Sequence, residues 1–349
     1  MFHTRLYWRR RHRRPIFLLI AAALLLLLLY GFSTRVFHTS VSHPPYQEII
    51  DAATKPEIIQ PEEKELVVAS LSGDDTEWLH EYFDGWRKNI YVVNDAHAPL
   101  TVAVNKGREA MPFLTYVDAS NRSYVVLPAN LNPRYIIDRY DDLPNVSIFI
   151  HALRYQWHNE DPMYDGVPVL KRLRLEHVHK RGYVALRCSW SMGCPAELSP
   201  LHPRTSNDDR SRAEKAYADV FRLFFPNEEV PKTIGAHCSS QFAVSRDRVR
   251  ARPKKEYEMI RDWLLRTNLD DQVSGRIIEY MWHIIFGMDA VDCQDAGECF
   301  CEVFGLCNLT CNREGCEKRY KLPKFATIPK GWPEVGPGTD GWPERGWSD

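Results

Sequence analysis

A glutamate and a histidine near the C-terminal end of the sequence have the types and spacing needed for proton transfer. Glu279 and His283 are four residues apart in SGRIIEYMWHIIF, so a continuous helix would make them neighbours. The carboxylate would then orient the histidine or raise its pKa, and either residue would suit a general base. A buried ion pair that braces the helix is the alternative. The pattern differs from the His-Glu-x-x-His of zinc peptidases, so it does not favour a metalloprotease.

A second group of candidates follows a predicted strand that ends at His151. His151 and His158 flank Trp157, and a histidine at a strand end beside aromatic rings fits a pocket that stacks a sugar or a base. We predict that His151 is catalytic and that Trp157 and His158 bind substrate, with structural packing as the alternative. Gln241, in SSQFAVSRDRV, is a further binding candidate.

Positive charges precede a predicted helix in the segment NKGREA. Lys106 and Arg108 would suit an anionic group there, because a helix N-terminus already favours negative charge. Such residues can stabilise a leaving diphosphate. Glu109 belongs to the same binding prediction. Ordinary surface charges at the start of a helix are the alternative.

Acidic pairs at a strand end are the usual site of a divalent metal beside a diphosphate. The predicted strand ends at Ile150-His151 without such a pair, and Asp141-Asp142 precede it, where a turn explains them. A divalent metal is therefore doubtful. G-x-S-x-G, P-loop and G-x-G-x-x-G motifs are missing from the sequence, which disfavours serine hydrolases, P-loop enzymes and dinucleotide oxidoreductases.

Nine cysteines indicate disulfide bonds. Six of them crowd into the segment 293–316, and their spacing lacks the repeated C-x-x-C of zinc knuckles. Disulfides are therefore favoured over zinc. The pairing stays open, and the odd number leaves one thiol over. The candidates are Cys188, Cys194, Cys293, Cys299, Cys301, Cys307, Cys311 and Cys316.

The elements that must position these residues follow a strand–helix–strand order. Strands are predicted at 65–70 and 89–94 with a helix at 76–83 between them, which indicates a βαβ unit and a parallel sheet. Further expected elements are a helix opening at 105–110, helical rhythm at 135–140, strands at 148–150 and 236–245, two helical pieces in 246–266 divided near Pro253, and a buried helix at 274–286.

The N-terminal region predicts a membrane anchor. Residues 16–32 are almost unbroken apolar residues behind an arginine cluster, and a good cleavage site is missing, so a retained anchor is favoured over a cleaved signal peptide. The positive-inside rule then predicts a single-pass type II protein whose later domain faces the lumen of the Golgi or the endoplasmic reticulum. In such a domain Asn121 and Asn308 are candidate glycosylation sites.

The charge balance and the predicted segment boundaries describe the rest of the chain. Lys plus Arg number 45 against 46 for Asp plus Glu, so nucleic acid is not an expected partner. We predict a cytoplasmic basic tail at 1–15, the anchor at 16–32, a stem at 33–64, one luminal α/β domain at 65–320 and a disordered tail at 321–349.

Six blocks resemble a fungal family of membrane-anchored proteins known as a domain of unknown function, and the resemblance extends from Glu65 to about Cys307. The blocks are NKGREA (105–110), YIIDRYDDLP (135–144), FIHALRYQWH (149–158), GYVALRC (182–188), QFAVSRDRVRARP (241–253) and SGRIIEYMWHIIFG (274–287). One departure is that the family joins FLTYV directly to YIIDRYDDLP. Residues 118–134 therefore read as an insertion or as an unspliced intron, and in the second case the Asn121 sequon is an artefact.

A more distant resemblance is to nucleotide-sugar glycosyltransferases with a single α/β domain. The anchor and stem, the early strand ending at Ala69-Ser70 and the phrase SSQFAVSRDRV carry it. It implies a nucleotide sugar as donor and a carbohydrate or glycoprotein as acceptor. A non-catalytic luminal or cell-surface binding domain is the second hypothesis, and a glycosidase, which needs two carboxylates across a cleft, is less favoured.

Overall fold

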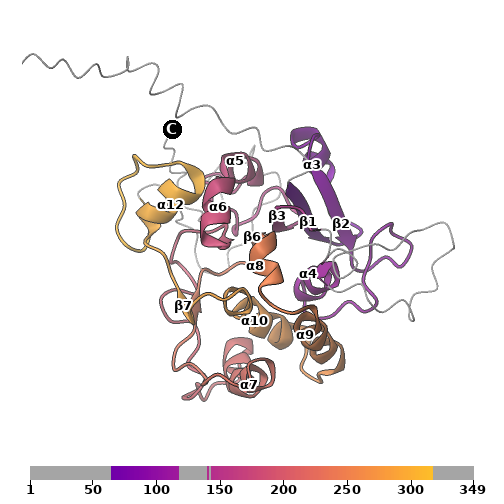
Figure 1. Ribbon diagram of the computed structural model, residues 1–349, viewed down its shortest axis with the longest axis vertical. Coiled ribbons are helices and arrows are strands. Elements are labelled where there is room, and N and C mark those ends of the chain that lie inside the picture. The colour runs from indigo at the N-terminus through magenta and orange to yellow at the C-terminus, as the bar shows by residue number, and fades with distance from the viewer. Residues whose placement is uncertain (1–63, 118–139, 141–142, 317–349) are drawn as a thin grey trace, which may run out of the picture. The chain divides into compact units, whose positions relative to one another are not determined.

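A computed structural model describes residues 64–117, 140 and 143–316 (Figure 1). The predicted basic tail, the anchor at 16–32, the stem up to residue 63, the whole insertion at 118–134 with Asn121, the predicted helical residues 135–139 and the tail at 321–349 lie outside these residues. Within them, no helix combines the length and the apolar character that a membrane crossing requires.

The centre of the domain is a mostly parallel five-stranded sheet in the order β2-β1-β3-β6-β4. β2 and β3 pair in parallel on either side of β1, and β6 runs antiparallel to both β3 and β4. The strands are β1 (Lys64–Ser70), β2 (Arg87–Val92), β3 (Val146–His151), β4 (Tyr183–Ala185) and β6 (Phe242–Ser245). β1 and β3 are buried along nearly their whole length, which explains their continuous apolar runs.

The strand order reverses between β1 and β3. From β1 the chain continues to β2 on one side, then crosses to β3 on the other side, and β3 leads on to β4 further in that direction. In open sheets of this kind, ligands bind beyond the carboxyl ends of the two strands at which the connections diverge. Ser70 ends β1 and His151 ends β3, so this position lies between them.

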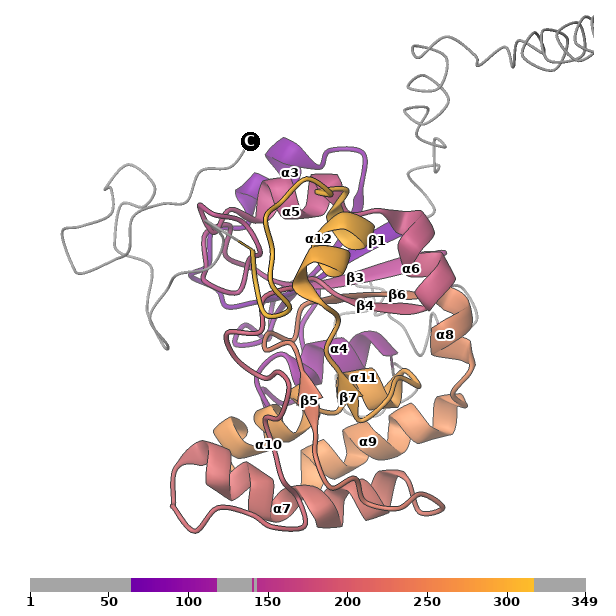
Figure 2. The same cartoon turned by 90° about the vertical axis from the view of Figure 1, so that its left-hand side faces the viewer.

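Helices cover both faces of the sheet (Figure 2). Helices α5 (Gly166–Arg172), α6 (Leu175–Arg181) and α12 (Ala296–Phe304) lie on one face, with α3 (Glu77–Tyr82) on the same side. The opposite face carries α4 (Ala110–Val117), α7 (Asp209–Phe224), α9 (Lys254–Arg266), α10 (Asp271–Glu279) and α11 (Trp282–Ile285). Helix α8 (Arg246–Arg250) follows β6 directly.

Aromatic side chains fill the core beneath the sheet. Phe149 of β3 stacks on Phe242 of β6 with ring centroids 4.7 Å apart. Phe113 of α4 meets the Phe149 ring edge-on at 5.1 Å, and Trp282 lies 5.4 Å from Phe242. Burying such rings removes a large apolar area from water, which holds α4 and α11 against the sheet.

Two predicted elements are interrupted. The expected strand at 236–245 is wrong, because β5 (Gly235–Ala236) pairs with β7 (Val291–Asp292) in a separate small sheet and only β6 joins the central one. The expected helix at 274–286 is also wrong as one helix, because α10 ends at Glu279 and α11 begins at Trp282. The division of 246–266 at Pro253 is confirmed by the boundary between α8 and α9.

Four disulfides join all eight candidate cysteines and decide the pairing that the sequence left open. The bonds are Cys188–Cys299, Cys194–Cys293, Cys301–Cys307 and Cys311–Cys316, and Cys238 is the remaining thiol. The first two fasten the segment 293–299 to the segment that follows β4. This number of disulfides fits a secreted or luminal domain.

Candidate functional site

The side chain of His151 pairs with Glu109 at the carboxyl end of β3. Nδ1 of His151 lies 3.2 Å from Oε1 of Glu109, which directly precedes α4. Both side chains are mostly enclosed, with 14 and 26% of their surface exposed. Burial alone would raise the pKa of Glu109, but the neighbouring His151 more than offsets this effect and the pKa is lowered. Nε2 of His151 is buried and has no hydrogen-bond partner among the described residues.

Aromatic rings continue from His151 along the same edge. The His158 ring stacks on His151 at 4.9 Å, and Trp157 lies 4.0 Å from His158. The buried guanidinium of Arg187, which follows β4, lies over the Trp157 ring at 4.9 Å. Burial, together with the neighbouring His151 and Arg187, holds the pKa of His158 well below its ordinary value. His158 is therefore neutral at pH 7.

Gln241 fixes the backbone at the end of β3. Its Oε1 accepts the His151 backbone N–H at 3.1 Å, and its Nε2 donates to Oδ1 of Asn159 at 3.1 Å. The amide of Asn159 in turn donates to the carbonyls of Arg154 and Tyr164. The predicted residues His151, Trp157, His158, Gln241 and Glu109 are thus brought together, and this network holds the loop after β3 that carries Trp157 and His158.

Glu279 lies behind this group, at the end of α10. Its Oε1 accepts a hydrogen bond from Sγ of Cys238 at 3.3 Å. Burial raises the pKa of Glu279, and Arg276 opposes this shift. Glu109 and His151 are close enough to Glu279 to affect its pKa as well. Glu279 therefore lies near the Glu109–His151 pair.

His283 does not join Glu279, so the expected Glu-x-x-x-His neighbourhood is wrong. The break between α10 and α11 separates the two side chains, and His283 is buried with Nε2 3.2 Å from the carbonyl of Ala290. Burial lowers the pKa of His283 to about 4, which is opposite to the expected increase. This position gives His283 a packing role in the small β5–β7 region.

Lys106 and Arg108 contact the helices beneath the sheet. Nζ of Lys106 donates to the carbonyl of Thr267 at 2.6 Å, where it caps α9, and Arg108 donates to the side chain of Gln272. The charge of Arg108 nevertheless lowers the pKa of both Glu109 and His158. Arg108 is thus near Glu109 and His158, whereas Lys106 is hydrogen-bonded to the end of α9.

Backbone contacts place the Lys106–Glu109 loop on α10. Gly107 has a φ of +66°, and a side chain there would meet Leu264. A Cβ on Gly275 of α10 would lie 2.9 Å from the carbonyl oxygen of Gly107. The two glycines therefore allow the close approach that delivers Glu109 to His151.

Two residues of this region were not predicted from the sequence. Arg187 directly precedes the disulfide-bonded Cys188, and Cys238 is the thiol that the odd cysteine count had left over. Their position in the blocks GYVALRC and beside QFAVSRD was the available signal. In the described part of the chain, no three His, Cys, Asp or Glu side chains are grouped as a metal site would require. Asn308 is exposed.

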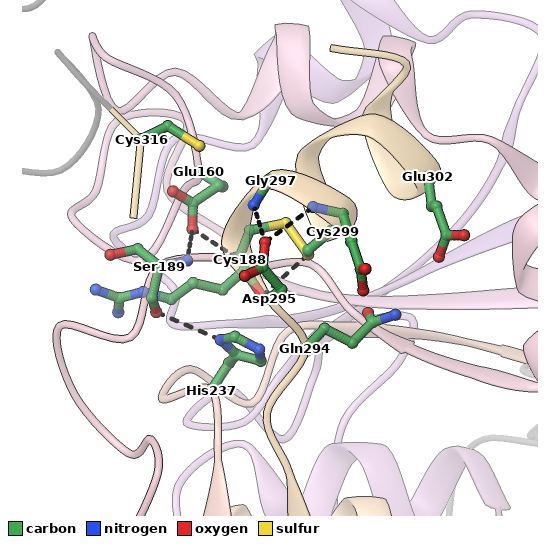
Figure 3. Close-up of a disulfide and its surroundings, with 12 residues drawn as sticks. Glu160, Cys188, Ser189, His237, Gln294, Asp295, Gly297, Cys299, Glu302 and Cys316 are labelled. Carbon is green, nitrogen blue, oxygen red and sulfur yellow. Dashed lines mark hydrogen bonds between the residues drawn. A yellow bond between two sulfur atoms is a disulfide. The ribbon is translucent and has the colours of Figure 1, made fainter. Parts of the chain in front are cut away.

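A disulfide holds the segment that follows β4 (Figure 3). Cys188 bonds to Cys299 of α12, and the Glu160 carboxylate accepts the backbone N–H groups of Cys188 and Ser189 at 2.7 and 3.1 Å. The ring of His237 lies 3.3 Å from the carbonyl of Ser189. The segment after β4 is thus held both covalently and by hydrogen bonds, which fixes Arg187.

Comparison with known proteins identifies a family and no further relative. The family described as "Protein of unknown function (DUF3431)" matches residues 66–131 and 128–302, and the two matched stretches meet inside the segment 118–134. No curated protein matches the chain. No solved structure matches it either. Because the two stretches cover most of its length, the chain belongs to the family of proteins of unknown function DUF3431.

Proposed function

We propose that the protein is a glycosyltransferase-like enzyme of the secretory pathway, which transfers a sugar from a nucleotide donor to a hydroxyl of a carbohydrate or glycoprotein. The observation that carries the proposal is the position of the Glu109–His151 pair beyond the divergence of β1 and β3. Ligands of doubly wound sheets bind at that position, and a carboxylate–histidine pair there suits proton transfer from a hydroxyl.

The surroundings of the pair support a sugar-binding site. Trp157 and His158 place aromatic rings beside His151, and aromatic rings with polar edges are typical of sites that bind sugars or bases. Arg108 and Arg187 supply positive charge near these rings, as the pKa of His158 reflects. Positive side chains would stabilise a leaving diphosphate without a metal ion.

Residues 16–32 would anchor this domain on the luminal side of the Golgi or the endoplasmic reticulum. Four disulfides are consistent with that side of the membrane. Protease treatment of intact microsomes tests the orientation: the disulfide-rich domain should be protected until detergent is added. Digestion of the domain in intact vesicles would contradict a type II orientation.

Donor binding tests the enzymatic proposal. Full-length protein in detergent should be melted with UDP-glucose, UDP-galactose, UDP-N-acetylglucosamine and GDP-mannose, each with and without Mn²⁺. At a donor concentration of about 100 Kd, binding adds about 2.7 kcal/mol to stability and gives a clear shift. No shift with any donor would contradict the proposal. A shift without release of nucleoside diphosphate, tested with mixed glycan acceptors, would favour the non-catalytic binding domain.

A further inference from the structure

We propose that His151 is the general base of the transfer reaction and that Glu109 is the positioning residue that holds its ring in the reactive tautomer. The inference rests on the proposed function and deepens it, because it assigns the proton transfer to one nitrogen of one side chain and names the reaction as a single displacement. The two residues come from separate elements, one from the end of β3 and the other from the start of α4.

The hydrogen bonding of the ring determines which nitrogen is basic. Glu109 Oε1 is an acceptor 3.2 Å from Nδ1, so in the neutral ring the proton lies on Nδ1 and the lone pair lies on Nε2. Nε2 has no hydrogen-bond partner in the described ranges of the chain, so its lone pair is not engaged by the protein. The atom itself is buried while 14% of the side chain is exposed, so an acceptor hydroxyl reaches Nε2 by displacing the side chains packed around it. A carboxylate that orients a histidine in this way also stabilises the imidazolium that forms during the reaction.

Two neighbours restrain the orientation of the ring, because Glu109 holds Nδ1 and the His158 ring stacks against the His151 ring. Gln241 fixes the backbone of His151 by accepting its N–H. The titratable groups that interact with His151 are Glu109 before α4, His158 after β3 and Glu279 on α10. Arg108 and Arg187 are one neighbour further away and act on His158.

In the proposed step, the acceptor hydroxyl gives its proton to Nε2 of His151. The acceptor oxygen forms a bond to the anomeric carbon of the donor sugar. The bond from that carbon to the diphosphate oxygen breaks, and its electron pair leaves with the nucleoside diphosphate. Because one displacement occurs from the opposite side, the anomeric configuration of the product is inverted.

Three substitutions test the assignment in full-length protein. With the donor and acceptor that turn over in the screen above, His151→Gln should lower kcat by a factor on the order of 10²–10⁴ and leave the thermal shift with donor in place. Glu109→Gln should lower kcat by a factor of up to about 10⁴, because the histidine would take the wrong tautomer, and Glu109→Asp should recover part of it, since a carboxylate remains. Glu302→Gln is the matched control, because Glu302 faces His177 at 3.7 Å in a second pair between α12 and α6 and should keep wild-type kcat.

A measurement without substrate separates the two proposals. ¹⁵N NMR of the histidine rings at neutral pH should show His151 with the proton on Nδ1, and Glu109→Ala should move it to Nε2. An Nε2–H ring in the wild type would overturn the inference, as would wild-type kcat in His151→Gln. If no donor binds or turns over while the Nδ1–H ring is observed, the proposed function fails, and the general-base assignment fails with it although the Glu109–His151 pair is established.

Discussion

Sγ of Cys238 lies 3.3 Å from Oε1 of Glu279, so the single free thiol donates its hydrogen to a buried carboxyl group. Burial raises the pKa of the thiol, and the neighbouring Glu279 raises it further. Thiolate is the reactive form of cysteine. We therefore predict that native protein resists alkylation at Cys238 at pH 8, whereas unfolded, non-reduced protein takes up one label per chain.

Mass spectrometry after iodoacetamide treatment measures this difference. The unfolded, non-reduced sample serves as the positive control and also tests the four disulfides, because a broken pair would add two labels. Fast labelling of native Cys238 would mean that the Cys238–Glu279 contact is open to solvent.

The disulfides Cys188–Cys299 and Cys194–Cys293 should stabilise the fold non-additively. They close loops of 111 and 99 residues, but they join the same two segments. With one bond intact, the other closes a loop of only about a dozen residues in the unfolded chain, so its removal lowers the free energy of unfolding by roughly 3 kcal/mol. Removal of both bonds also frees a loop of about 100 residues, so the free energy of unfolding falls by roughly 7–8 kcal/mol in total. Denaturant unfolding of Cys→Ala pairs should therefore show that the double removal costs more than twice the single one.

The short bond Cys301–Cys307 is the control for loop length. It closes a six-residue separation, so its removal should cost only about 2 kcal/mol. Equal losses for the single and double removals of the long pairs would show that the segments 188–194 and 293–299 stay together without covalent bonds.

Two buried histidines should make the domain sensitive to acid. His237 and His283 each have one ring nitrogen on a backbone carbonyl, and burial lowers the pKa of both to about 4. Their unfolded value is near 6.5, so the unfolded state binds more protons between pH 6.5 and 4. The contribution of these two histidines to the free energy of unfolding is therefore fully present above about pH 7. It falls as the pH decreases through this window, by about 2 kcal/mol per histidine between pH 7 and pH 5.

Urea unfolding at pH 5 and pH 7 measures this loss. His237→Gln and His283→Gln should each reduce the difference in unfolding free energy between the two pH values, whatever they do to stability at pH 7. The same difference in wild type and both variants would contradict the assignment of the acid sensitivity to these side chains.

The contact between Gly275 and Gly107 should couple α10 to the His151 pair. A methyl group at position 275 would lie 2.9 Å from the Gly107 carbonyl oxygen, so Gly275→Ala should push the loop that carries Glu109. We expect a loss of stability of about 1–3 kcal/mol together with lower turnover. Gly85→Ala is the control, since a Cβ there meets nothing within 4 Å, and it should change stability by less than about 0.5 kcal/mol. Unchanged stability and turnover in Gly275→Ala would mean that the loop is free to move.

Local patterns predicted the elements whose signal lies in a continuous stretch. The apolar runs predicted β1 and β3, and Pro253 predicted the boundary between α8 and α9, because a proline has no N–H for a helix interior. Helices α5, α6, α7 and α12 were not predicted, although α7 is a 16-residue helix with a regular buried side.

Packing between segments that are far apart in the sequence determines the features that local patterns did not predict. The apolar spacing of 274–286 suits one helix, yet Tyr280 and Met281 are both fully buried at a bend that directs α11 into the core. The sequence likewise placed His151 at a strand end but could not show that Glu109, 42 positions earlier, would reach its ring. That pairing depends on β3 and α4 meeting at one edge of the sheet.

Hydrogen exchange upon donor binding tests most directly whether the site lies at the divergence of β1 and β3. With the nucleotide sugar that gives the largest thermal shift, protection should rise in residues 70–74, 105–110, 151–159 and 238–242, which surround the Glu109–His151 pair. Protection confined to the disulfide-rich segment 293–316, or no change with any donor, would contradict a nucleotide-sugar site at this edge.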